Sequence, residues 1–270
     1  ALGDNPTTVE IMEVKKNNAN ITQYINTGFS KSNIQTAINN YNNTQGDLYT
    51  KLHRKGQAYN SIYDIISFMW TQYDTQKEIQ QQKGINVDNY TMGAIMPKCL
   101  FDFINEHTEL NFPPVKKLYF GIERGHNDFK DVNALLIIGH ALPEAEHFIR
   151  QHETLTGEHI HHKHRNYTIN TTILNDQKGK EIQFKHISHN NPQIKKLIHI
   201  YTQSQLLQAI ERARTANRTY KNPVEIVIAT ATPLYDIPIN NLNYTRKNDL
   251  YSHQYYNAQF THGQPSLIVE

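Results

Sequence analysis

Two arginines and a glutamine lie close together in the segment Gln208-Ala-Ile-Glu-Arg-Ala-Arg214, at the end of a predicted helix. Arg212 follows Gln208 by four residues, so both side chains project from one helical face. Arg214 points roughly 160° away from Arg212 while the helix stays regular. One phosphate group is therefore within reach of Gln208 and Arg212, whereas Arg214 needs the helix to end or bend. The alternative is a surface helix in which Glu211 pairs with Arg214.

A second candidate segment runs from Phe120 to Phe129, between two predicted strands, and contains Gly121 and Gly125. Glycine has no Cβ atom, so it allows the backbone to approach a ligand closely. Ligands of open α/β sheets bind at the carboxyl ends of the strands. A plain turn is the alternative, since glycine-rich loops at strand ends are common.

Hydrophobic periodicity predicts the elements that must hold these segments. Continuous apolar runs, typical of strands buried on both faces, occupy 91–96, 115–120, 134–138 and 224–229. Two further strands are predicted at 9–14 and 21–24. Helical spacing of apolar residues is found within 34–41, 62–70, 100–104, 145–149 and 203–214. Ser32 is the expected N-cap of the first helix, and Pro143 is expected in the first turn of the fourth. Strands that alternate with helices predict an α/β fold with a mostly parallel sheet flanked by helices.

The chain is long enough for one large domain, which we expect over residues 1–240. Within it, 44–90 form a helical elaboration and 152–190 a polar, histidine-rich insertion, and 241–270 follow as a C-terminal extension. No apolar run approaches the roughly 18 residues of a membrane span. A single cysteine, Cys99, excludes an internal disulfide framework. Without a signal segment, these features predict a cytoplasmic protein that does not enter a membrane.

Fifteen histidines are present, and four of them form a cluster: His159, His161, His162 and His164. On a strand, His159 and His161 would share a face, which is a usable two-ligand spacing for a metal. No paired carboxylates or further cysteines accompany them, so we favour a solvated basic loop and predict no metal site. A metal-dependent nuclease built on this cluster has little support for the same reason.

A net charge of +2 permits a nucleic-acid partner without requiring one. The basic doublets Lys116-Lys117 and Lys195-Lys196 are solvated surface in the simpler interpretation and phosphate contacts in the alternative. Aromatic side chains that could stack on bases are core or interface residues in the simpler interpretation. They are Trp70, Tyr251, Tyr255 and Tyr256.

The order of these segments resembles the second, C-terminal RecA-like motor domain of superfamily 2 helicases, in their phage- and plasmid-associated branch. Arg124-Gly125-His126-Asn127 resembles the "RG-x-N" loop of motif V, and Gln208 to Arg214 resembles the "QAIGRAR" helix of motif VI. Three further segments match in order: Asp4 to Lys31 resembles the crossover from the first motor domain, Met96-Pro97-Lys98 the motif IV junction, and Gly139 to Pro143 a "GRPLP" stretch. The resemblance covers roughly residues 4–40 and 91–238.

This resemblance implies a RecA-like fold and a role in ATP-driven movement along DNA. Arg212, with Gln208 and Arg214, would act as the arginine finger on the γ-phosphate. Nucleotide and nucleic-acid contacts would come from Arg124, Gly125, Asn127, Gly121 and Lys98. ATP and Mg²⁺ would be held mainly by an N-terminal RecA-like domain of the same protein, because this sequence contains neither G-x-x-x-x-G-K-[ST] nor DE-x-[HD]. We expect the chain to hydrolyse no ATP by itself.

Three positions depart from the family pattern. Glu211 stands where a glycine precedes the finger, Thr215 where many relatives have a second arginine, and His140 where "GRP" has arginine. A carboxylate beside a γ-phosphate is repulsive unless it is neutralised or turned away. Glu211 therefore favours the alternative function, a non-catalytic nucleic-acid-binding or scaffold domain with degenerate helicase motifs.

Overall fold

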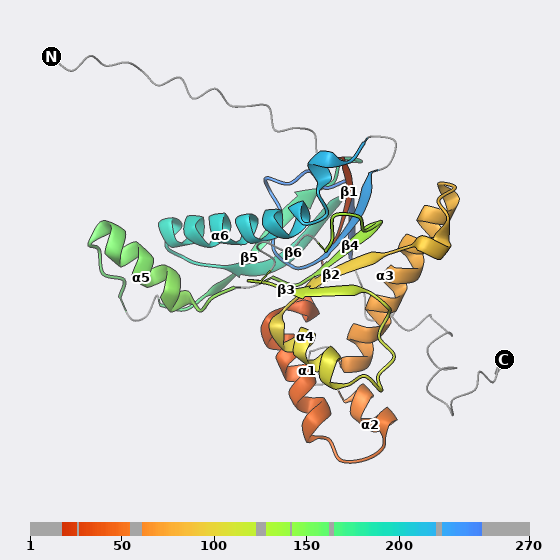
Figure 1. Ribbon diagram of the computed structural model, residues 1–270. Coiled ribbons are helices and arrows are strands. Elements are labelled where there is room, and N and C mark those ends of the chain that lie inside the picture. The colour runs from red at the N-terminus through yellow and green to blue at the C-terminus, as the bar shows by residue number, and fades with distance from the viewer. Residues whose placement is uncertain are drawn as a thin grey trace.

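The computed structural model describes residues 18–25, 27–54, 61–122, 128–140, 142–161, 165–219 and 223–244. Six strands form one sheet with the order β3-β2-β4-β7-β1-β8, and every neighbouring pair is parallel. Their bounds are Ala19–Ile25 (β1), Met92–Met96 (β2), Lys116–Tyr119 (β3), Ala134–Ile138 (β4), Val224–Ala229 (β7) and Asn241–Tyr244 (β8). The predicted α/β fold with a parallel sheet flanked by helices is thus confirmed, and it is consistent with a RecA-like arrangement (Figure 1).

The central strands are buried along their whole length. Every residue of β2, β4 and β7 is buried, and β4 pairs with β7 through partners such as Leu135 and Ile226. Helices or loops cover both faces, which explains why these strands were readable as continuous apolar runs. The short strand predicted at 21–24 is the middle of β1, which pairs with both β7 and β8. The strand predicted at 9–14 lies outside the described residues.

Four helices pack on one face of the sheet, below it in Figure 1. They are α1 (Lys31–Asn43), α2 (Leu48–His53), α3 (Ile62–Gln82) and α4 (Lys98–Glu106). Phe29 and Phe68 anchor this layer, with ring centroids 4.7 Å apart. The N-cap of α1 is Ser30, whose side chain accepts from the Asn33 amide, so the prediction of Ser32 was wrong by half a turn.

The opposite face is covered by α6 (Pro192–Glu211), which is much longer than the helix predicted at 203–214. Pro192 occupies its first turn, and the side chain of Asn191 caps the amides of Gln193 and Ile194. Twenty residues of helix span about 30 Å, whereas the six residues of β7 span about 20 Å. Because α6 runs antiparallel to the strands it connects, its first turns project beyond their carboxyl ends.

Two smaller elements pack around this projecting part of α6 (Figure 1). Helix α5 (Ala145–Thr156) places Phe148 and Ile149 against Ile194 and Ile198 of α6. The antiparallel hairpin of β5 (Thr168–Asn175) and β6 (Glu181–Ser188) lies in the segment predicted as an insertion or hairpin. Helix α5 continues to Thr156, so this segment is more ordered than expected. Pro143 precedes the N-cap Glu144 and is not in the first turn, contrary to the prediction.

None of the helices within the described ranges is long and apolar enough to cross a membrane. The segment 44–90 contains α2, α3 and a short 3-10 helix at Val87–Asn89, in agreement with its predicted helical character. Beyond Pro238, where no element was predicted, β8 forms the edge of the sheet.

Candidate functional site

The end of α6 lies at the amino edge of the sheet, because the chain passes from it into the first residue of β7. Arg218 fixes this position. Its guanidinium donates from Nη2 to the carbonyl oxygens of Lys130 at 3.0 Å and Val132 at 2.7 Å, and from Nε to Ala213 at 3.3 Å. Val132 comes just before β4, and burial around the guanidinium lowers the pKa of Arg218. Arg218 therefore joins the end of α6 to the chain that leads into β4.

Gln208 and Arg212 lie on this joined edge with polar atoms that are buried and unsatisfied. The Oε1 atom of Gln208 and the Nε atom of Arg212 have no hydrogen-bond partner within the described part of the chain. Arg212 is the C-cap of α6, and its own amide donates to the carbonyls of Ala209 and Ile210. A buried donor without a partner costs free energy, and a guanidinium offers five donors in a planar fork. An oxyanion from outside the described residues would satisfy this group.

Arg214 ends the helix in the way the sequence argument required. Its backbone is left-handed, with φ 49° and ψ 51°, and it is the one non-glycine residue with positive φ in the described ranges. This conformation costs an L-residue roughly 1–2 kcal/mol. The regular 160° separation from Arg212 therefore does not apply, because the chain turns between the two arginines. Arg214 is exposed at this turn.

Glu211 is oriented by the same turn. Its Oε1 accepts a hydrogen bond from the hydroxyl of Thr215, at 3.1 Å, and Thr215 is buried at the start of a 3-10 helix. The residue that replaces the expected second arginine thus binds the carboxylate that replaces the expected glycine. This contact draws one carboxylate oxygen toward the turn.

The other predicted site residues are not gathered here. Lys98 begins α4, directly after the carboxyl end of β2, and its Nζ lies 3.1 Å from Asp102. That hydrogen bond raises the pKa of Lys98. Gly121, with φ 106°, follows β3, and the preceding Phe120 amide bonds the carbonyl of Met96. Both therefore lie at the carboxyl edge, separated from Arg212 by the strand length of about 16 Å.

Arg124, Gly125 and Asn127 lie outside the described residues, but the chain that follows them is at the amino edge. The carbonyl of Asp128 accepts from Nζ of Lys116, the first residue of β3, at 3.3 Å. The amide of Asn133 donates to the carbonyl of Thr91, which precedes β2. Between Gly121 and Asp128 the chain has therefore crossed from one edge of the sheet to the other.

At the carboxyl edge, the conformation of Gly139 places His140 against the loop after β7. Gly139 has φ 65°, and a Cβ atom there would lie 2.3 Å from the carbonyl oxygen of Phe29. Nδ1 of His140 lies 3.2 Å from the Thr230 hydroxyl and 3.1 Å from that of Thr232. Burial lowers the pKa of His140 to about 4. At neutral pH it therefore carries no charge and does not replace the arginine of the family pattern.

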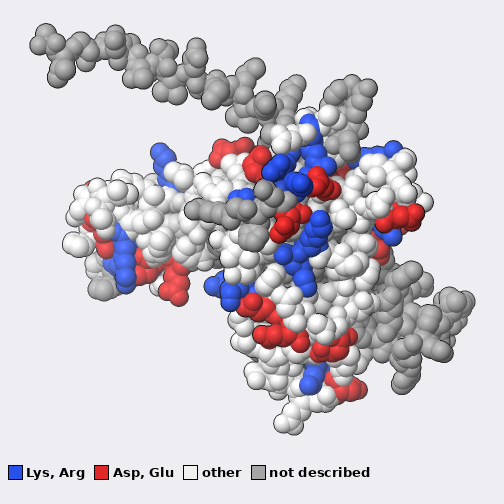
Figure 2. All heavy atoms as spheres, in the orientation of Figure 1, with Lys and Arg blue, Asp and Glu red and all other residues white. Residues whose placement is uncertain are grey.

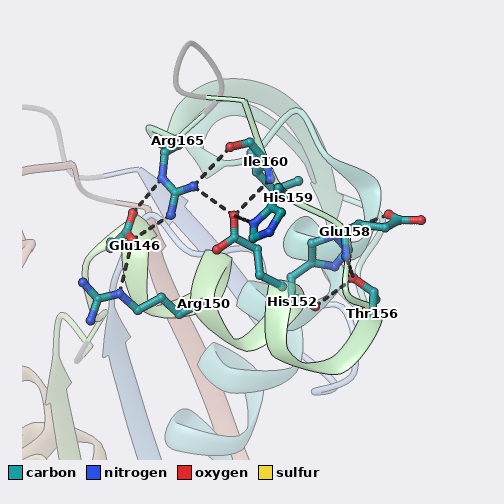
Figure 3. Close-up of polar contacts among 9 residues, drawn as sticks. Glu146, Arg150, His152, Thr156, Glu158, His159, Ile160 and Arg165 are labelled. Carbon is teal, nitrogen blue, oxygen red and sulfur yellow. Dashed lines mark hydrogen bonds and ion pairs between the residues drawn. The ribbon is translucent and has the colours of Figure 1, made fainter.

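The histidine cluster has a structural setting (Figure 3). Arg165 bridges Glu146 at 2.7 Å and Glu153 at 2.9 Å, and these contacts hold the segment after α5 against the helix. The hydrogen bonds lower the pKa of both carboxyls. His159 is exposed, with Nδ1 3.7 Å from Glu153. His162 and His164 are outside the described residues, and the described ones hold no group of three potential metal ligands.

Of the remaining candidates, Trp70 donates from its indole to the Asn111 carbonyl and packs against the core. Tyr251, Tyr255 and Tyr256 lie outside the described residues. Arg218 was missed, because its position six residues after Arg212 follows no helical spacing. Comparisons with protein family models, with curated proteins and with solved structures give no match for this chain.

Proposed function

We propose that this chain is the second RecA-like motor domain of an ATP-dependent DNA helicase or translocase. The observation that carries the proposal is the joining of two segments at the amino edge of the sheet. The helix that ends in Gln208 and Arg212 is tied by Arg218 to the chain that follows the Arg124–Asn127 loop. Two segments about 85 residues apart are thus brought to one edge, as joint contact with a nucleotide requires.

The chemistry follows from the unsatisfied donor of Arg212. During phosphoryl transfer, negative charge spreads over the oxygens of the transferred group, and a guanidinium can stabilise that charge through parallel N–H bonds. Gln208, one turn earlier, supplies an amide to orient the same group. ATP and Mg²⁺ would be bound mainly by an N-terminal RecA-like domain, which carries the phosphate cradle. The protein would act in the cytoplasm.

Nucleic-acid contact at this edge is supported by charge. Lysine and arginine side chains gather where α6 ends, at the top of the molecule, with acidic side chains among them (Figure 2). Arg212, Arg214, Arg218 and Lys130 belong to this edge. Phosphate contacts position a protein on DNA without reading its sequence, as a motor that moves along any sequence needs.

The test measures DNA-stimulated ATP hydrolysis by the full natural gene product that contains this chain. Arg212→Ala should lower kcat by about 10³- to 10⁵-fold, the range for arginine fingers, while ATP binding persists. Arg150→Ala is the matched control, because Arg150 is an exposed arginine of α5 that pairs with Glu146. Unchanged hydrolysis in the Arg212 variant, or a gene product without any P-loop, would overturn the proposal.

Glu211 favours one other candidate, a non-catalytic DNA-binding or scaffold domain. In that case the full gene product would bind DNA but hydrolyse no ATP, and Glu211→Gly would not change this. In the motor, Glu211→Gly removes a carboxylate next to the finger and should preserve or raise hydrolysis.

A further inference from the structure

A cleft of about 290 Å³ lies at the other edge of the sheet, under the projecting turns of α6. Its walls come from four places in the chain: the loop after β4, the end of β6, the first three turns of α6 and the loop after β7. It is enclosed in part by Leu142, Pro192, Ile198 and Pro233. Its volume is near the lower end of the range for ligand pockets, about 300–1,000 Å³. Parallel α/β sheets bind ligands at this carboxyl edge.

The wall formed by the loop after β7 is held in place by two buried glutamines. Nε2 of Gln23, from β1, donates to the carbonyls of Thr230 at 3.2 Å and Thr232 at 2.8 Å. Nε2 of Gln203, from α6, donates to the carbonyl of Pro233 at 2.7 Å. Each glutamine is almost fully buried. The cleft is therefore a preformed site whose lining does not depend on exposed, mobile side chains alone.

The charge of the cleft comes from Lys195 and Lys196. Both line it, both are exposed, and neither forms an ion pair or hydrogen bond with another described residue. One carboxylate is near, Asp236, and it is engaged by Nε2 of His199 at 3.0 Å. Burial and the neighbouring Lys195 lower the pKa of His186, which keeps this third basic group neutral. The cleft thus presents two unpaired ammonium groups to an anion.

Aromatic rings stand beside these ammonium groups. The rings of His199 and Tyr235 lie 5.5 Å apart, and Tyr235 is about half exposed. Its hydroxyl lies 2.9 Å from that of Thr172 on β5, which fixes the ring. An exposed, fixed aromatic ring next to a basic groove is the combination that binds single nucleotides, by stacking on the base and pairing with the phosphate.

We propose that this cleft binds one nucleotide unit, with its base against Tyr235 and His199 and its phosphate at Lys195 and Lys196. The nucleotide is either a free mononucleotide or one residue of a single strand. The inference goes beyond the motor function, because the cleft lies at the opposite edge from Arg212 and needs no ATP hydrolysis.

Titration of the full chain with thymidine 5′-monophosphate, thymidine and oligothymidylate tests the proposal. Lys195→Ala with Lys196→Ala should weaken the monophosphate or the oligonucleotide about tenfold or more, the loss expected for charge-assisted contacts. Tyr235→Ala should weaken it about five- to hundredfold. The charge-matched control is Lys178→Ala with Lys185→Ala, because both lysines are exposed and neither lines the cleft. The control should bind as the unchanged protein does.

The arms distinguish the two sources. Tighter binding of the monophosphate identifies a free nucleotide. Tighter binding of oligothymidylate, with a salt dependence that falls by about 0.7 per lost phosphate contact in the lysine variant, identifies a strand. Crosslinking with 4-thiothymidine 5′-monophosphate should label peptides containing residues 186–199 or 232–235. Equal affinity for thymidine and its monophosphate, equal losses in both double variants, no binding, or labelling elsewhere would overturn the proposal.

Discussion

Gly139 offers the sharpest test of how the carboxyl edge is built. Gly139→Ala combines two costs: a left-handed backbone, roughly 1–2 kcal/mol for an L-residue, and a Cβ atom 2.3 Å from the Phe29 carbonyl oxygen. That oxygen belongs to backbone, so it cannot rotate away, and overpacking of this kind costs about 1–3 kcal/mol. Together they predict a loss of about 2–5 kcal/mol in the free energy of unfolding.

Gly157→Ala is the matched control. Gly157 caps α5 with a nearly identical φ of 73°, but nothing lies within 4 Å of its added Cβ atom. Only the backbone cost remains, about 1–2 kcal/mol. Urea denaturation followed by circular dichroism gives both values. Equal losses in the two variants would refute the argument that contact with Phe29, rather than left-handed backbone alone, fixes glycine at position 139.

Two further predictions concern pairs of contacts described above. Because the pKa of His140 is about 4 in the folded protein and near 6.5 in an unfolded chain, the unfolded state binds more protons between these values. Stability should therefore fall as pH drops from 6.5 to 4, by at most about 3 kcal/mol, and be independent of His140 above 6.5; a His140→Gln variant that keeps the same slope in denaturation curves would contradict this. Arg218→Ala should remove about 2–4 kcal/mol of stability, since three carbonyls lose a charged donor, and faster amide exchange should appear first at Lys130–Val132; exchange unchanged there, relative to an Arg150→Ala control, would count against the tie.

The predictable part of the fold is the part whose environment is uniform. Strands β2, β4 and β7 are buried on both faces, so their sequences are continuous apolar runs. The edge strand β8, with the sequence NLNY, and the hairpin of β5 and β6 have polar or mixed faces and gave no usable pattern. The first half of α6 was missed because its lysines and His199 line a cleft, where a helix shows no ordinary apolar stripe.

The candidate site was predictable in its residues but not in its geometry. The i,i+4 spacing of Gln208 and Arg212 placed them correctly on one face of a helix. Lys98 and Gly121 were grouped with them, yet sequence order does not reveal at which edge of a sheet a loop ends. That depends on the return of the chain from β3 to β4, which crosses the sheet, and on Arg218, whose three carbonyl partners lie in distant segments.

The length mismatch between α6 and the sheet has a mechanical consequence. The helix is held on the sheet near Leu206 and Ile210, so a tilt pivots there. Arg212 lies about 6 Å from such a pivot and Lys195 about 20 Å on the other side. A displacement of the arginine end is therefore multiplied about threefold, in the opposite direction, at the lysine end. One rigid rod thus couples the two edges of the domain, and any closure around Arg212 changes the width of the cleft.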